Sequence, residues 1–350
     1  MRRVTTLVSA LLAGALILTG CGGGDDNADT TPEASGSSSA PASDIKVGLA
    51  YDIGGRGDQS FNDAAAAGLD KAADEFGIET KEAEASNGEA DTAKEERLRV
   101  LANAGYNPVI AVGFAYSGAV AKVAKELPDT QFAIIDDGAA LGDNIANLLF
   151  AEEQGSFLVG AAAALKSKAG NIGFVGGVEV PLIKKFEAGY TAGAKEVNPD
   201  IEVQVKYLTQ PPDFSGFGDP AKGKTAAAGM FDAGADVVYQ AAGGSGGGVF
   251  EAAKTAGGLA IGVDSDQYNT ADPAVKDVIM TSMLKKVDVA VYDFIKSVVD
   301  DAFTAGPTTY DLEKDGVGYS TTGGQIDDIT TKLDEYKAKI ISGEITVPTE

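Results

Sequence analysis

The sequence contains no histidine and one cysteine, Cys21. A single cysteine rules out an internal disulfide and a cysteine-based metal site within one copy of the chain. Without histidine, the Ser-His-Asp mechanism is excluded, and most hydrolase and metal-site designs lose the imidazole on which they depend. Basic residues are also scarce, with 28 Lys and Arg against 52 Asp and Glu and a net charge of -24. Because nucleic-acid binding needs a basic face, we expect no nucleic-acid partner. We also expect no metal and no cofactor.

The N-terminus has the parts of a secretory signal peptide. Arg2 and Arg3 precede an uncharged apolar run over residues 4–18, which is short for a membrane span of about 20 residues. The run ends in Leu-Thr-Gly-Cys21, which resembles the bacterial lipobox, in which the cysteine becomes the lipidated first residue. We therefore predict a signal peptide over residues 1–20 and a chain anchored through Cys21 to the extracytoplasmic face of the cell membrane. Residues 21–43, rich in Gly, Ser, Asp, Thr, Ala and Pro, are predicted to form a flexible tether.

The remaining chain alternates short apolar runs with helical patterns. Strands are predicted at 45–51, 108–112, 132–136, 172–175, 201–208, 237–240, 260–263 and 278–283, and helices from Ser60, after Ser117, and at 152–166, 181–197, 220–233, 248–256 and 287–303. This alternation predicts an α/β fold with two doubly wound parallel-sheet lobes joined by a hinge. We expect lobe 1 at 44–147 plus 284–350 and lobe 2 at 148–283, with crossings near Asn147 and between Asp264 and Lys285. The segment from Thr308 onward, with a strand-like piece at 316–319 and a helix over 332–341, has no clear lobe.

Polar, acidic and glycine residues follow the predicted strands. In open α/β sheets, ligands bind beyond the carboxyl ends of the strands, so these residues are the first site candidates. They recur in both halves of the chain, which favours a cleft between two lobes. They are Asp52 with Gly54-Gly55, Asp136-Asp137, Gly176-Gly177, Gly243-Gly-Ser-Gly246 and Asp264-Ser-Asp266.

Two segments match catalytic patterns but lack other features that those patterns need. Gly218 to Thr225 fits a P-loop literally, but a Pro/Gly-rich segment separates it from the preceding strand, and Pro220 removes an N–H donor. Gly243-Gly-Ser245-Gly-Gly247 fits a nucleophile elbow, with a predicted strand before it and a helix after it. A serine nucleophile needs an adjacent base, and without histidine only a Ser-Lys dyad is left as an alternative. We interpret the first as a loop leading into a helix and the second as a glycine-rich loop able to approach a ligand closely.

A family resemblance covers most of the chain from about residue 45 to 286. The matching segments, in order, are Asp58-Gln-Ser-Phe-Asn62 with Gly68, Glu152-Glu-Gln-Gly-Ser-Phe-Leu-Val-Gly160, Phe186-Glu-Ala-Gly-Tyr190, Phe217-Gly-Asp-Pro-Ala-Lys-Gly-Lys224, Gly243-Gly-Ser-Gly246 and Gly262-Val-Asp-Ser-Asp-Gln267. They are similar to the basic membrane protein family of substrate-binding lipoproteins. The resemblance implies a periplasmic-binding-protein type I fold, an ABC permease as partner and, since several members bind purine nucleosides, a nucleoside ligand.

The resemblance also implies roles for individual residues. Phe61 is expected to stack on the base, with Phe217 or Phe214 as the second ring. Asn62 and Asp136 are expected to read the edge of the base, and Asp52, Asp264 and Lys285 to contact the ribose. The loop of Gly244, Ser245 and Gly246 is expected to close from the second lobe. Spacing alone would make Lys285 a surface lysine.

The residue types suit these roles. An aromatic face gives stacking of about 1–3 kcal/mol per base, and Asn can donate and accept at once. Ser60, followed three residues later by Asp63, predicts a capping box that fixes Phe61 and Asn62 in the first helical turn. We expect binding without turnover, by closure of the lobes. The alternatives are a sugar-type or other small ligand with a sensory role, or an enzyme that cleaves nucleosides.

Overall fold

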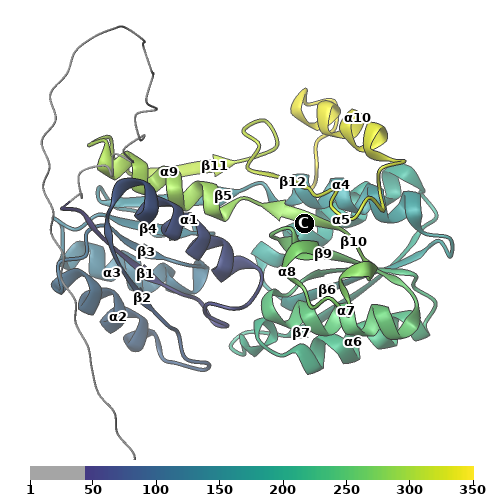
Figure 1. Ribbon diagram of the computed structural model, residues 1–350, viewed down its shortest axis with the longest axis horizontal. Helices are drawn as coiled ribbons and strands as arrows, with labels where there is room; N and C mark the ends of the chain where they lie inside the picture. The colour runs from purple at the N-terminus through teal and green to yellow at the C-terminus, as the bar shows by residue number, and fades with distance from the viewer. Residues whose placement is uncertain (1–43) are drawn as a thin grey trace, which may run out of the picture. The chain divides into compact units, whose positions relative to one another are not determined.

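The computed structural model describes residues 44–350. The predicted signal peptide, Cys21 and the tether lie outside the described residues. The described part contains two six-stranded sheets, and their strand pairs are parallel except for the pair of β10 with β12. Helices cover both faces of each sheet (Figure 1). The predicted class, two doubly wound α/β lobes, is confirmed.

The first sheet has the strand order β11-β5-β4-β3-β1-β2. On one face, Leu69 and Val291 belong to a core shared by α1 and α9; on the other, Leu98 and Val120 bury α2 and α3. The strands are β1 (Lys46–Ala50), β2 (Glu79–Ala83), β3 (Val109–Ala111), β4 (Phe132–Ile135), β5 (Ile145–Phe150) and β11 (Gly306–Tyr310), and the helices are α1 (Phe61–Phe76), α2 (Asp91–Asn103), η1 (Phe114–Tyr116), α3 (Ser117–Glu126) and α9 (Val287–Val299).

The second sheet has the order β12-β10-β9-β8-β6-β7. Phe157 of α4 and Tyr190 of α5 pack on one face, and Met230 of α6 and Val249 of α7 pack on the other. The strands are β6 (Asn171–Val178), β7 (Glu202–Thr209), β8 (Val237–Ala241), β9 (Leu259–Asp264), β10 (Ile279–Lys285) and β12 (Val317–Tyr319), and the helices are α4 (Glu152–Lys166), α5 (Pro181–Val197), η2 (Ser215–Phe217), α6 (Pro220–Asp232), η3 (Gly243–Ser245), α7 (Gly246–Ala256), α8 (Gln267–Thr270), η4 (Lys276–Val278) and α10 (Thr330–Ile341).

Helices α4 and α5 pack with their backbones almost in contact. A Cβ atom on Gly160 would lie 2.1 Å from the Tyr190 carbonyl oxygen, and one on Gly189 would lie 2.1 Å from the Glu153 carbonyl oxygen. No larger residue fits at either position without moving a helix, because real Cβ atoms do not come that close to backbone. The glycines therefore fix the distance between the two helices that follow β5 and β6.

The chain passes between the two sheets three times: from β5 to α4, from β10 to α9, and from β11 to β12. The second crossing comes later than the sequence predicts, because β10 stays paired with β9 as far as Leu284. The C-terminal segment is shared, since β11 pairs with β5 while β12 pairs with β10 and α10 packs on α4. We propose lobe boundaries that follow the two sheets, which moves residues 317–350 from the first lobe to the second.

Candidate ligand-binding site

A cavity lies at the carboxyl ends of strands from both sheets. The space between its lining atoms is about 550 Å³, a volume that includes open solvent. The first lobe contributes Asp52, Ile53, Asp58, Phe61, Asn62, Phe114 and Asp136, and the second contributes Leu182, Ile183, Phe186, Phe217, Ala241, Gly243, Val263, Asp264 and Lys285.

Most residues singled out from the sequence line this cavity: Asp52, Phe61, Asn62, Asp136, Phe217, Asp264 and Lys285. Gly244, Ser245 and Gly246 do not line it, although the neighbouring Gly243 does. Ser245 is fully buried and holds a second loop, since its Oγ donates to the Gly216 carbonyl at 2.7 Å and accepts from the Asp219 N–H at 2.7 Å. Phe214 does not line the cavity either; its ring lies 6.0 Å from the ring of Phe114, which does.

The first turn of α1 is held differently from the predicted capping box. Ser60 makes no side-chain cap; its Oγ donates instead to Asp264 of the other lobe at 2.5 Å. The Asp58 carboxylate caps the helix by accepting from the N–H groups of Ser60 and Asn62 at 2.9 Å. The Asp58 carboxylate, two residues before Ser60, replaces the predicted serine cap because a carboxylate accepts several N–H groups at once. Asn62 Oδ1 then accepts from the Asp52 N–H at 3.0 Å, which joins this turn to the end of β1.

Asp136 and Asp264 occupy equivalent positions in the two lobes. Asp136 follows β4 and Asp264 ends β9, which are third in their respective sheet orders. Both have left-handed backbones, with φ of 65° and 64°. Left-handed residues other than glycine are uncommon, and Asp tolerates this conformation better than most residues. The backbone of each sheet thus turns a carboxylate into the same cavity.

Lys285 is the buried cation of the site. Its side chain is 2% exposed, its Nζ donates to Asp136 Oδ2, and it lies 3.5 Å from Glu152 Oε1. Three rings surround the ammonium, with centroids 4.9 Å away for Phe61, 5.1 Å for Phe150 and 5.6 Å for Phe186. Burial lowers the pKa of Lys285, but Asp136 and Glu152 outweigh burial and raise it, so the ammonium stays charged.

Acidic side chains outnumber this cation. Burial raises the pKa of Asp52 to about 6 and that of Asp264 to about 6. Burial also raises the pKa of Asp136 to about 7, where the charges of Glu152 and Asp264 oppose the effect of Lys285. The cavity therefore offers mainly acceptors, which match a ligand rich in N–H and O–H donors and disfavour an anion.

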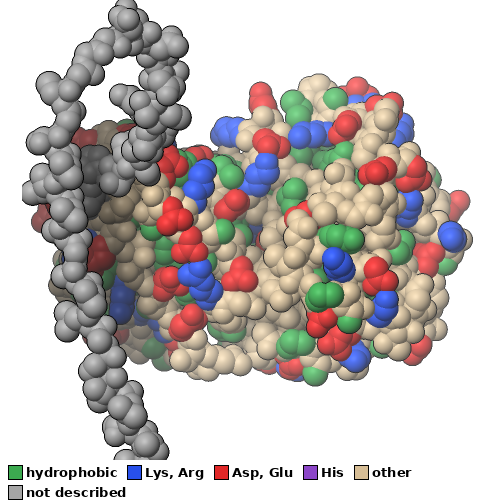
Figure 2. Space-filling view, in the orientation of Figure 1, with side chains coloured by type: hydrophobic (Ala, Val, Ile, Leu, Met, Phe, Trp, Pro, Cys, Tyr) green, Lys and Arg blue, Asp and Glu red, His purple; other side chains and the backbone are tan. Residues whose placement is uncertain are grey.

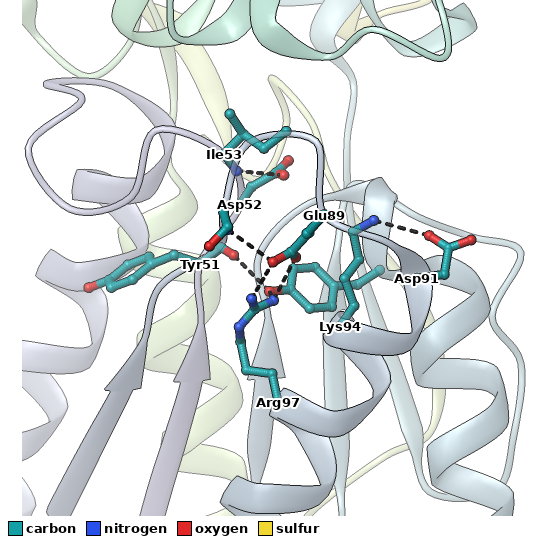
Figure 3. A network of polar contacts seen from close by, with 9 residues as sticks. Tyr51, Asp52, Ile53, Glu89, Asp91, Lys94 and Arg97 are labelled. Atoms are coloured by element: carbon teal, nitrogen blue, oxygen red, sulfur yellow. Dashed lines mark hydrogen bonds and ion pairs between the residues drawn. The ribbon is translucent and has the colours of Figure 1, made fainter.

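A polar network supports the loop that carries Asp52 (Figure 3). Arg97 pairs with Glu89 at 2.5 Å and donates to the Tyr116 hydroxyl at 2.6 Å, and that hydroxyl donates to the Tyr51 carbonyl at 2.8 Å. A Cβ at Gly113 would lie 2.4 Å from Asp52 Oδ2, and Gly113 has a φ of 98°. Only glycine therefore lets the chain turn past the Asp52 carboxylate into η1, where Phe114 reaches the cavity.

Several lining residues escaped the sequence interpretation. Phe114 follows β3 at the carboxyl edge of the first sheet, but in sequence nothing separates it from an aromatic residue of the core. Leu182, Ile183 and Phe186 lie on α5 and have the apolar spacing of any core-facing helix. Among residues 44–350, no cluster of acidic side chains is arranged to hold a metal ion.

The sequence and the fold both match known substrate-binding proteins. Residues 45–350 match the Bmp family model, described as "ABC transporter substrate-binding protein PnrA-like". The chain belongs to the Bmp family. It is an extracytoplasmic ABC transporter substrate-binding protein.

Relatives match over nearly the full length. The "CD4+ T-cell-stimulating antigen" of Listeria innocua is 35% identical, over 99% of this chain and 98% of that protein. The "ABC transporter nucleoside-binding protein BmpA" of Lactococcus lactis is 34% identical, over 100% of this chain and 99% of that protein. A solute-binding protein of an ABC transporter system from Aeropyrum pernix has a similar structure, with a TM-score of 0.76 and 31% identity, over 87% of this chain and 94% of that one.

Some relatives of this Bmp family member carry names that mention lipoproteins, such as the "Uncharacterized lipoprotein PYRAB04520" of Pyrococcus abyssi, which is 34% identical over 87% of this chain and 73% of that protein. Within residues 44–350, none of the helices is both long and apolar enough to cross a membrane. On the face shown in Figure 2, Asp and Glu are spread among Lys and Arg without a continuous basic area.

Proposed function

We propose that this Bmp family protein binds a nucleoside, with a purine base, and delivers it to an ABC permease from a lipid anchor at Cys21. The observation that carries the proposal is the convergence, on one cavity, of aromatic rings and hydrogen-bonding acids from both lobes. A nucleoside needs both, because its base is flat and its ribose carries adjacent hydroxyls. The name of the Lactococcus lactis relative, a nucleoside-binding protein, supports the same ligand class.

The cavity supports a role for each part of the ligand. Phe61 and Phe217, from opposite lobes, are proposed to stack on the two faces of the base. Asn62 and Asp136 are proposed to bind its edge, and Asp52, Asp264 and Lys285 the ribose. Carboxylates that lose their hydroxyl partners are left unpaired, so the proposal implies steep rejection of deoxy analogues.

Closure of the lobes is the proposed mechanism, and the structure has contacts that would form with it. Besides Ser60 with Asp264, the Gln59 carbonyl of the first lobe accepts from Ser265 Oγ at 3.0 Å and from Gln267 Nε2 at 2.9 Å. Contacts made only in the closed form stabilise it when a ligand bridges the lobes. The closed form is then the state that a permease would bind.

Isothermal titration calorimetry tests the ligand. The full-length chain in detergent, unfolded and refolded to remove carried-over ligand, is titrated with adenosine, guanosine, inosine, uridine, adenine, ribose and galactose. Saturable binding of a purine nucleoside, weakened at least tenfold in Phe61→Ala and Asp264→Ala, supports the proposal. Binding of a sugar and of no nucleoside would overturn the ligand assignment, and release of free base during incubation would favour the enzyme alternative.

A further inference from the structure

Glu152 is a buried acid next to the cavity but not part of its lining. It is the first residue of α4, directly after the crossing from the first sheet, and its side chain is 1% exposed. Lys285, its partner at 3.5 Å, is the last residue of β10, directly before the second crossing. The Glu152–Lys285 pair thus joins two of the three segments that connect the lobes.

A helix N-terminus stabilises acidic residues, but this does not explain the orientation of Glu152. Glu153, the next residue in the same first turn, interacts with the helix dipole as favourably as Glu152 does, but it makes no ion pair with Lys285. Glu152 instead continues a line of alternating charges. Its Oε2 lies 3.2 Å from Nζ of Lys185, whose side chain is 35% exposed, and its Oε1 faces Lys285.

The line of charges ends at Asp136, a lining residue of the cavity that has one carboxylate oxygen without a partner. Lys285 donates to Asp136 Oδ2, while Asp136 Oδ1 is buried and has no hydrogen-bond partner among the described residues. A buried carboxylate oxygen without a donor is costly, and a ligand N–H removes that cost. On its other side, Lys285 lies 3.5 Å from Glu152 Oε1 in an ion pair without a hydrogen bond, and 4.9 Å from the centre of the Phe61 ring.

We propose that Glu152 is a positioning residue for ligand recognition: it holds Lys285 against Asp136 Oδ2, so that Asp136 Oδ1 accepts a hydrogen bond from an N–H of the ligand. This inference rests on the proposed function, because it needs a ligand with an N–H donor. Glu152 itself does not touch the ligand. It acts on the ligand through Lys285 and Asp136, which do line the cavity.

The proposal has a distinct pH signature. Asp136 faces Lys285 of β10, Glu152 of α4 and Asp264 of β9, and Asp264 in turn faces Asp58 from the turn before α1. Burial, together with the charge of Glu152, raises the pKa of Asp136 to about 7 against the lowering effect of Lys285. Since the ligand is bound by the ionised form of Asp136, affinity should fall as the pH drops through about 7. Removing the charge of Glu152 should move that fall to lower pH.

The test uses the full-length chain, with guanosine as the probe, titrated calorimetrically between pH 5 and pH 9. Glu152→Gln is expected to weaken guanosine binding about tenfold at pH 8 and to move the midpoint of the affinity loss to lower pH. Glu153→Gln, on the same helical turn, removes a charge that acts on Glu152 and Lys185 but not on Asp136, so it should leave the midpoint unchanged. Glu152→Asp, which keeps the charge, should restore the midpoint and part of the affinity.

Weaker binding of Glu152→Gln with an unchanged midpoint would overturn the proposal, because a merely structural role moves affinity alone. If Glu152→Gln does not fold, Lys185→Met tests the exposed end of the line of charges. This variant should raise the pH midpoint of the affinity loss, because the charge of Glu152 is then less compensated. An unchanged midpoint would overturn the proposal.

A ligand-free measurement separates this proposal from the proposed function. The carboxyl carbon of Asp136 is titrated by NMR in the free protein, where Glu152→Gln should lower its pKa. If the parent chain binds no nucleoside, the proposed function fails while this titration still decides whether Glu152 acts on Asp136. An equal Asp136 pKa in both proteins would overturn the coupling on which the inference depends.

Discussion

At the scale of single residues, the site is a set of acceptors arranged around one cation. Asp136 and Asp264 reach the cavity from equivalent strand ends, each with a left-handed backbone. Lys285 is surrounded by Asp136, Glu152 and three rings, so its charge is already compensated inside the protein. A further negative charge brought by a ligand would therefore meet carboxylates and no free cation within the cavity lining.

Rejection of nucleotides follows from this arrangement. Guanosine 5′-monophosphate should bind at least about 100-fold more weakly than guanosine, because like charges held together in a buried site cost several kcal/mol. Calorimetric titration of both ligands at pH 8 and low salt measures the difference. Equal affinities would mean that the phosphate leaves the acidic cavity, and the orientation proposed for the ribose would be wrong.

The two aromatic candidates in the segment after β7 can be separated by substitution. Phe217 lines the cavity, whereas Phe214 contacts Phe114 from behind. Phe217→Ala should weaken nucleoside binding about tenfold or more by removing a stacking face. Phe214→Ala, the matched control three residues earlier in the same segment, should have a clearly smaller effect in the same titration. The reverse order would transfer the stacking role to Phe214.

Sequence reasoning located site residues only where position or chemistry marked them. Asp52, Asp136 and Asp264 follow strands, so the topology of a parallel sheet placed them at one edge. Lys285 came from the family resemblance, because spacing does not distinguish a buried lysine from a surface one. Ser60 has the residue type of a helix cap, but Asp58 takes that role and frees Ser60 for the other lobe. This change of capping residue depends on a contact between the lobes, and local sequence patterns carry no information about such contacts.

At the scale of elements, some helix boundaries are predictable because the sequence has clear start and stop signals there. Helices over 152–166 and 181–197 have the bounds predicted from sequence, the second because Pro181 marks its start. The sequence interpretation missed β2, α2, β5 and β11. β2 (Glu79–Ala83) is a polar edge strand and α2 buries only Leu98 and Leu101, so neither has a clear apolar period. Their structure comes from pairing and packing with distant segments.

The contact between α4 and α5 gives a prediction about stability. Gly189→Ala should destabilise the fold by about 1–3 kcal/mol, because the new Cβ would overlap the backbone of α4. Gly229→Ala is the matched control: a Cβ there, near the end of α6, meets nothing within 4 Å. It should stabilise the protein by about 0.5–1 kcal/mol through the lost flexibility of glycine. Urea denaturation of both variants measures the free energies of unfolding, and equal values would contradict close packing of these helices.

At the scale of the whole described chain, the lobes meet through the cavity and through contacts beside it. The hydrogen bond from Ser60 to Asp264 and those from Ser265 and Gln267 to the Gln59 carbonyl all lie between the lobes. In the proposed closure mechanism these contacts form only when the lobes close, so they would connect ligand affinity to the equilibrium between open and closed forms. Part of the binding free energy is thus set by residues that need not touch the ligand.

Ser60→Ala tests this connection. Loss of its hydrogen bond to Asp264 should favour the open form, which weakens nucleoside binding several-fold mainly through faster dissociation. Stopped-flow measurement gives the dissociation rate, and small-angle X-ray scattering reports the compaction on ligand addition. Ser117→Ala, at the start of α3 within the first lobe, is the control and should leave both unchanged. A slower association with unchanged dissociation would contradict a closure contact at Ser60.

The three crossings between the sheets also affect how the protein is made. The first sheet receives β11, and its covering helix α9, from residues 287–310, and the second receives β12 only at Val317–Tyr319. During synthesis, neither lobe has all its strands until almost the entire polypeptide has left the ribosome. A premature stop codon before β11 leaves both sheets unfinished, and one between β11 and β12 leaves the second sheet unfinished, so any truncation before Tyr319 leaves at least one lobe incomplete.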